Sequence, residues 1–270
     1  RRRRRGRGDQ PPLHRRRQHA AGRTGVHYQA LRRRDVRPPG SIPRSQDPRA
    51  RARHPYGSYN GEFGRYRSTP AGQSKGVVVV IQEIFGVNGH IREVADGYAD
   101  RGYLAIAPAL FDRIERNIEL GYTDADMGKG IELAFQGLEM AQTMKDLQAV
   151  VDHAATQGPV GVVGYCFGGL LTYLSACQLN GVTAASSYYG GGIAGVLDNQ
   201  PQCPLIMHFG ELDAHIPMTD VEKIKTANPN VPVHVYAADH GFNCDHRGSY
   251  NEPAAGLALE RTLAHFGEHL

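Results

Sequence analysis

The stretch that decides the fold is Val160-Gly161-Val162-Val163-Gly164-Tyr165-Cys166-Phe167-Gly168-Gly169. Its apolar start predicts a buried strand, and residues 170–179 after it are typical of a helix. Between strand and helix, Cys166 has a glycine two residues to either side, the pattern of a tight strand-to-helix turn that presents a nucleophile. A Cβ at either glycine would collide with neighbouring backbone. The turn lifts the thiol above the sheet and leaves the next N–H free to bind an oxyanion. The alternative is a purely structural cysteine.

Solid apolar runs alternate with helical patterns along the rest of the chain. Strands are expected over 76–81, 103–107, 160–163, 183–189, 204–209 and 231–236, and helices over 91–101, 126–156, 170–179, 219–227 and 253–269. An edge hairpin is expected over 56–67, an irregular stretch near 128–137, and Thr219 as a helix cap. This alternation predicts an α/β protein with a mostly parallel sheet covered by helices on both faces. Ligands of such sheets bind beyond the carboxyl ends of the strands.

The charge distribution divides the chain in two. Residues 1–53 contain 18 Arg and 3 Asp, a balance of +15, whereas the remaining 13 basic and 24 acidic residues give −11. The first part has few apolar residues and is expected to be disordered. It is interpreted as a basic arm for nucleic acid or anionic lipid, as a targeting peptide lacking an apolar core, or as sequence absent from the native protein. Residues 54–270 are expected to form one domain.

The composition also narrows location and partners. No apolar stretch approaches the roughly 20 residues that a membrane span needs, so no membrane partner is expected. The four cysteines show no paired spacing, which favours a reducing cytoplasmic location. His240, Cys244 and His246 form an H-x3-C-x-H cluster, but no second group completes a tetrahedral site, so neither metal nor cofactor is expected. A monomer or small homo-oligomer acting on a small molecule is the expectation.

Three chemically capable residues each follow a predicted strand. These are Cys166, Asp213 in Gly210-Glu211-Leu212-Asp213, and His240. A thiol needs a base to become a nucleophile, and an imidazole needs an acceptor on its second nitrogen to hold the right tautomer. The order nucleophile, acid, histidine is the one that α/β-hydrolases use. In the alternative interpretation Asp213 only closes its loop, and Glu211 is a neighbouring carboxylate that could serve in its place.

A carboxylate, Glu83, ends the most apolar strand of the chain. It is expected at the bottom of the pocket, where burial disfavours its charged form unless a cation pairs with it. Arg113, which follows the strand over 103–107, is a candidate partner for Glu83 or for an anionic substrate. In the alternative interpretation Glu83 is an acidic loop residue exposed to solvent.

Six segments together resemble the dienelactone hydrolase family over residues 56–270. They are Gln82-Glu83-Ile84-Phe85-Gly86-Val87-Asn88, Ala107-Pro108-Ala109-Leu110-Phe111, Gly164-Tyr165-Cys166-Phe167-Gly168-Gly169, Tyr188-Tyr189-Gly190, Gly210-Glu211-Leu212-Asp213 and His240-Gly241-Phe242. The resemblance implies a hydrolase of enol lactones such as dienelactone that needs neither metal nor organic cofactor.

The resemblance also implies roles for individual residues. Cys166 would be the nucleophile, His240 its base and Asp213 the orienting acid. The backbone N–H groups of Ile84 and Phe167 would form the oxyanion hole. Glu83 would hold the resting thiol and take its proton, and Arg113 and Tyr188 would bind substrate, with Arg113 on its carboxylate.

The sequence departs from the family in the loop after the histidine. Gly241 and Cys244 stand where well-known members have a serine and an arginine that contact the substrate carboxylate, and Arg247 is a nearby candidate substitute. Three alternatives therefore stay open. They are a thioesterase or general carboxylesterase on the same triad, a catalytically idle member, and a nucleic-acid-binding protein acting through residues 1–53.

Overall fold

A computed structural model describes residues 54–55 and 64–270. The chain divides into two units, Arg1–Pro43 and Arg44–Leu270, and the fold below concerns the second. The predictions for residues 1–53, and most of the hairpin expected over 56–67, lie outside the described residues.

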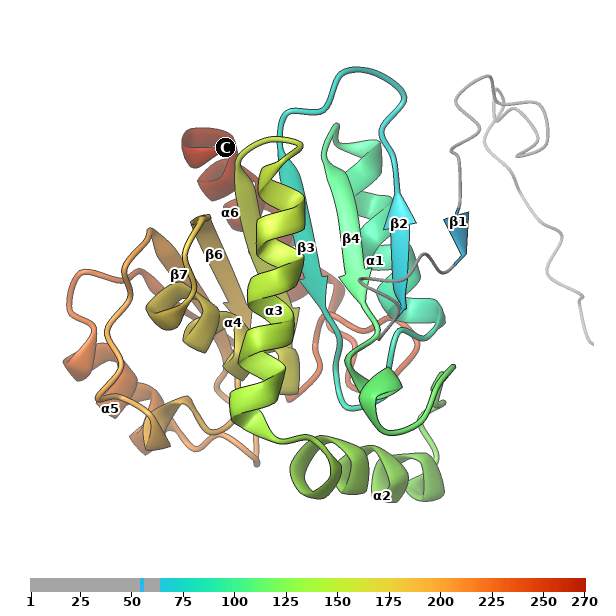
Figure 1. The fold of residues 1–270 in the computed structure, drawn as a ribbon. Coiled ribbons are helices and arrows are strands. Elements are labelled where there is room, and N and C mark those ends of the chain that lie inside the picture. The colour runs from blue at the N-terminus through green and yellow to red at the C-terminus, as the bar shows by residue number, and fades with distance from the viewer. Residues whose placement is uncertain (1–53, 56–63) are drawn as a thin grey trace, which may run out of the picture. The chain divides into compact units, whose positions relative to one another are not determined.

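The described residues form one eight-stranded sheet with the order β1-β2-β4-β3-β5-β6-β7-β8 (Figure 1). Its strands are β1 His54–Pro55, β2 Arg65–Ser68, β3 Val77–Ile81, β4 Leu104–Pro108, β5 Val160–Tyr165, β6 Val182–Tyr188, β7 Leu205–Gly210 and β8 Val233–Tyr236. Strands β3 to β8 are parallel, whereas β2 is antiparallel to β1 and β4. The predicted α/β class is confirmed.

Helices cover both faces of this sheet. They are α1 Gly89–Asp100, η2 Leu110–Arg113, α2 Asp124–Glu132, the π-helical turn η3 Leu133–Gly137, α3 Met140–Ala155, α4 Phe167–Gln178, η4 Ile193–Gly195, α5 Met218–Ala227 and α6 Glu252–His269. Helices α1 and α6 lie together, since the ring centroids of Tyr98 and Phe266 are 6.2 Å apart. Figure 1 shows α3 across the front of the strands and α1 behind them.

Among the described residues, 54–55 and 64–270, no helix is long and apolar enough to cross a membrane.

The centre of the sheet sets the place of the site. Strands β3 and β5 are buried along their whole length, as their β-branched runs predict, and Ile81 lies beside Gly164 in their parallel register. Glu83 and Cys166 each follow that pair by two residues. Because β5, β6, β7 and β8 are successive neighbours, the loops after β5, β7 and β8 open at the same edge.

Most boundaries of the expected elements shift by one to three residues, and two expectations fail in kind. The single helix expected over 126–156 is divided into α2 and α3 by the π-helical turn Leu133–Gly137, at the end of the stretch expected to be irregular. Thr219 is not a cap, because α5 begins at Met218 and Pro217 occupies the cap position, where no side chain caps the helix.

Candidate active site

The turn after β5 holds Cys166 in a strained conformation. Its φ of 55° and ψ of −115° lie where non-glycine residues are rare, at a cost of about 1–3 kcal/mol. A Cβ at Gly164 would lie 2.1 Å from the carbonyl oxygen of Gly168, and one at Gly168 would lie 2.4 Å from that of Ile81. The glycines are therefore required sterically, as the sequence predicts, and the sheet itself maintains the strain.

Asp213 and His240 meet beyond the ends of β7 and β8. The Nδ1 atom of His240 lies 2.7 Å from Oδ2 of Asp213. The other carboxylate oxygen accepts hydrogen bonds from the backbone N–H groups of His215 and Ile216, at 2.8 and 3.1 Å. Burial alone would raise the pKa of the Asp213 carboxyl, but the bond to His240 and the two N–H groups outweigh it and hold that pKa below its ordinary value.

The Cys166 side chain lies close enough to the His240 imidazole to help raise its pKa. Burial lowers the pKa of His240, but its contacts with Asp213 and Cys166 raise it more, so the net pKa lies above the ordinary value. The structure thus brings together the three residues that the sequence placed after separate strands. Asp213, and not Glu211, is the carboxylate that contacts the imidazole.

Two aromatic neighbours of His240 were missed by sequence reasoning. The ring centroids of Tyr189 and His215 lie 5.1 and 5.2 Å from that of His240, both edge to face. Tyr189 is fully buried and has a φ of 37°, rare for a non-glycine residue. The signals in the sequence were its position at the end of the strand predicted over 183–189 and its place in the segment Tyr188-Tyr189-Gly190.

The segments expected to form an oxyanion hole come from the ends of β3 and β5. Phe167 is the first residue of α4, where backbone N–H groups lack intrahelical partners. Ile84 follows β3, and helix α2 passes so close that a Cβ at Gly130 would lie 2.4 Å from the Ile84 carbonyl oxygen. This contact, which only glycine permits, fixes the peptide planes around Ile84.

Glu83 is buried beside this loop but does not hold the thiol as the resemblance implied. It is 1% exposed, and neither carboxylate oxygen has a hydrogen-bond partner. The Nη1 atom of Arg247 lies 3.9 Å from Oε1 of Glu83, so the pairing cation is Arg247 and not Arg113. Cys166 instead lies against His240.

The two residues expected to bind substrate are engaged elsewhere. The Nε and Nη2 atoms of Arg113 donate to the carboxylate of Asp146, at 2.7 and 2.5 Å. Tyr188 is fully buried, and its hydroxyl lies 2.7 Å from that of Thr262 on α6. Its side chain therefore does not reach the site, because it packs in the core; its carbonyl oxygen instead accepts the Cys166 N–H.

Arg247 lies where the sequence suggested a substitute cation. Its guanidinium carbon is 5.6 and 5.7 Å from the ring centroids of Phe85 and Tyr122, within cation–π range. A Cβ at Gly241 would lie 2.6 Å from its Nη1 atom, and the φ of Gly241 is +77°. The glycine after the histidine thus makes room for the guanidinium directly beside the site.

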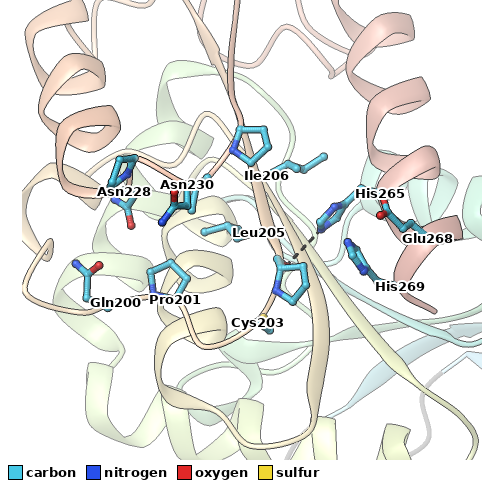
Figure 2. A pocket seen from close by; sticks show the side chains of 14 residues that line it. Gln200, Pro201, Cys203, Leu205, Ile206, Asn228, Asn230, His265, Glu268 and His269 are labelled. Carbon is cyan, nitrogen blue, oxygen red and sulfur yellow. Dashed lines mark hydrogen bonds between the residues drawn. The ribbon is translucent and has the colours of Figure 1, made fainter.

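A separate hollow of about 450 Å³ opens at the other edge of the sheet (Figure 2). It is lined by Leu205 and Ile206 at the start of β7, and by His265, whose ring approaches the Pro204 carbonyl oxygen at 3.4 Å. No residue of the candidate site lines it. The candidate site therefore lies at the carboxyl edge alone.

The parallel sheet and the strained cysteine turn, with an acid and a histidine after later strands, define an α/β-hydrolase. Comparison with known proteins narrows this class. The profile of the dienelactone hydrolase family matches residues 63–270. A putative carboxymethylenebutenolidase of Synechocystis sp. is 40% identical over 214 residues, covering 72% of this chain and 86% of that protein.

A carboxymethylenebutenolidase of Pseudomonas putida is 36% identical over 217 residues, which cover 76% of this chain and 92% of that protein. The crystal structure of a putative dienelactone hydrolase from Klebsiella pneumoniae subsp. pneumoniae superposes with a TM-score of 0.71 at 29% identity, covering 81% of this chain and 98% of that one. The chain belongs to the dienelactone hydrolase family and is therefore a hydrolase.

Proposed function

We propose that this hydrolase cleaves a small lactone or activated carboxylic ester, dienelactone-like in its chemistry, through a thiol acyl-enzyme. The observation that carries the proposal is the Asp213–His240 hydrogen bond of 2.7 Å, together with the strained turn that presents Cys166, whose side chain influences the same imidazole. A nucleophile, its base and an orienting acid in this order are what acyl transfer requires. Family membership supports the same reaction class.

In the proposed cycle the Cys166 thiolate attacks the carbonyl carbon while His240 carries the proton. The N–H groups of Ile84 and Phe167 stabilise the oxyanion, the ring C–O bond breaks, and the enolate leaving group takes the proton from His240. Water then gives a proton to His240 and attacks the thioester, which releases the acid and restores the thiol. Because an enolate leaves readily, such esters suit a thiolate, whereas amides should be poor substrates.

Arg247 is proposed to contact an anionic group of the substrate. It is 18% exposed at its side chain and lies against the Gly241 backbone, next to the imidazole. Its pairing with Glu83 is long, at 3.9 Å, which leaves guanidinium donors for a carboxylate. Phe135, 60% exposed with its ring 5.5 Å from that of Phe167, offers an apolar surface beside the nucleophile.

The test compares Cys166→Ala and Cys166→Ser with the unchanged protein on dienelactone and p-nitrophenyl acetate. We expect the alanine variant to lose turnover of both esters and the serine variant to keep a small remnant, because the neutral hydroxyl depends more heavily on its base. Acyl transfer to Cys166 is also expected to add the acyl mass to that residue in a rapid quench. Full activity of Cys166→Ala would overturn the assignment.

The alternative is a thioesterase or general carboxylesterase on the same residues. It is favoured by the engagement of Arg113 with Asp146, which removes one expected contact with a substrate carboxylate. A panel of thioesters and neutral esters against carboxylate-bearing lactones distinguishes the two. A preference in kcat/KM for the neutral substrates would favour the alternative.

A further inference from the structure

A second cluster of reactive side chains lies beside the site, in residues that the proposed cycle does not use as nucleophile or base. Glu83 follows β3, His90 lies at the start of α1 and Cys244 lies in the loop after β8. One ligand atom from each lies within 4.8 Å of the others, and all three residues are buried. The sequence could not show this group, because Cys244 lies far along the chain from Glu83 and His90.

The cluster contains three polar atoms without hydrogen-bond partners. Both carboxylate oxygens of Glu83 and the Nε2 atom of His90 are buried and make no hydrogen bond. Buried polar atoms are nearly always paired, so three orphans in one place point to a missing ligand. A metal ion would satisfy them together.

The chemistry of the set suits a transition metal of the zinc class. Thiolate, imidazole and carboxylate are the ligands that Zn²⁺ uses, and three protein ligands leave one position open. The Nδ1 atom of His90 lies 3.3 Å from Oδ1 of Asp245, the arrangement that commonly orients a ligating histidine. The Cys244 thiol donates to the Tyr122 hydroxyl, 3.2 Å away, so metal binding exchanges this hydrogen bond for coordination.

One positive charge opposes a metal ion here. Arg247 lies 3.9 Å from Oε1 of Glu83 but makes no hydrogen bond to it, so the carboxylate can turn towards a cation of higher charge. A hollow of about 390 Å³ reaches one member of the cluster, His90, and carries the acidic groups of Glu93 and Asp245. Arg101 also lines it.

We propose that Glu83, His90 and Cys244 form a binding site for a divalent transition metal such as Zn²⁺. Binding displaces the thiol proton to solvent and draws Glu83 into coordination. Glu83 is the residue before Ile84, whose N–H belongs to the oxyanion hole of the proposed function, on which this step rests. A bound ion that draws Glu83 away is therefore expected to inhibit hydrolysis, which makes the cluster an inhibitory site.

The experiment titrates the untagged full chain, carrying Cys166→Ser, with Co²⁺ as a spectroscopic substitute for Zn²⁺. The serine removes the thiol of Cys166, which lies beside His240 and could otherwise bind Co²⁺ there. We expect one equivalent of Co²⁺ to give thiolate-to-metal charge-transfer absorption that stoichiometric Zn²⁺ removes. Cys244→Ser should abolish the charge-transfer band, and His90→Gln should weaken Co²⁺ binding by about 10-fold or more. Circular dichroism and Tm establish that each variant is folded.

A matched control separates this cluster from a second one at the surface. His90, Asp245 and His246 also lie within 4.8 Å of one another, but Asp245 and His246 are exposed. His246→Ala should therefore leave the band unchanged. The proposal is overturned if folded protein gives no thiolate band, or if the band survives Cys244→Ser. Inhibition is measured separately, as hydrolysis of p-nitrophenyl acetate by the chain with Cys166 intact and stoichiometric Zn²⁺. Binding with the expected ligand dependence but without loss of this hydrolysis would contradict the inhibitory effect and not the metal site.

Discussion

Among single residues, Arg247 and Arg113 differ in the groups that their guanidinium groups contact. Arg113 donates two hydrogen bonds to Asp146, whereas Arg247 has a long ion pair with Glu83. We expect Arg247→Gln to lower kcat/KM for a carboxylate-bearing lactone by roughly 10- to 100-fold, mostly through KM, because a charged hydrogen bond contributes about 1.5–3 kcal/mol. The measurement is steady-state kinetics on dienelactone.

Arg113→Gln is the matched control for this prediction. It should leave KM for the lactone unchanged and instead lower Tm, because it removes the partner of a nearly buried carboxylate. Neutral p-nitrophenyl acetate checks that Arg247→Gln has not damaged the triad through Glu83. Equal losses on the charged and neutral esters would argue against a carboxylate contact at Arg247.

Sequence reasoning at this scale succeeded where steric rules were strict. The glycines around Cys166 are demanded by contacts of 2.1 and 2.4 Å, and the order of Cys166, Asp213 and His240 follows the strands. It failed for Tyr188, because a residue at a strand end can point into the core as well as into the site. Its direction depends on where Thr262 of α6 packs, which no local pattern encodes.

Among the secondary-structure elements, helix α2 positions the loop that contains Ile84. We expect Gly130→Ala to lower kcat on p-nitrophenyl acetate by roughly tenfold to a hundredfold with little change in KM. Its Cβ would meet the Ile84 carbonyl oxygen at 2.4 Å and displace the adjoining N–H from the oxyanion. Loss of a whole oxyanion donor costs about 10²–10³ in kcat, so a displaced one should cost less.

Gly128 on the same helix gives a stringent control. No atom lies within 4 Å of a Cβ built there, so Gly128→Ala should keep kcat and raise Tm through the higher helix propensity of alanine, about 1 kcal/mol. Unchanged kcat in folded Gly130→Ala would show that the α2 contact does not set the oxyanion geometry.

Elements were predictable where apolar periodicity was continuous, as in β3 and β5. The division of the helix expected over 126–156 was only partly predictable, because the π-helical turn depends on tertiary contacts. Phe135 of that turn packs its ring 5.5 Å from that of Phe167. The cluster of Glu83, His90 and Cys244 was beyond prediction for the same reason, since two loops and a helix must fold before it exists.

At the scale of the whole chain, the +15 of residues 1–53 and the −11 of the remainder suggest separate roles. The family profile begins at residue 63 and the site lies within the described residues, so a chain of residues 54–270 should keep the kcat/KM of the full chain on p-nitrophenyl acetate. DNA binding, if residues 1–53 act as a basic arm, should fall steeply with salt in the full chain and vanish in the shortened one. Kinetics and fluorescence-anisotropy titrations at two salt concentrations measure both. Loss of hydrolysis on shortening, with Tm unchanged, would instead place part of the catalytic function in residues 1–53.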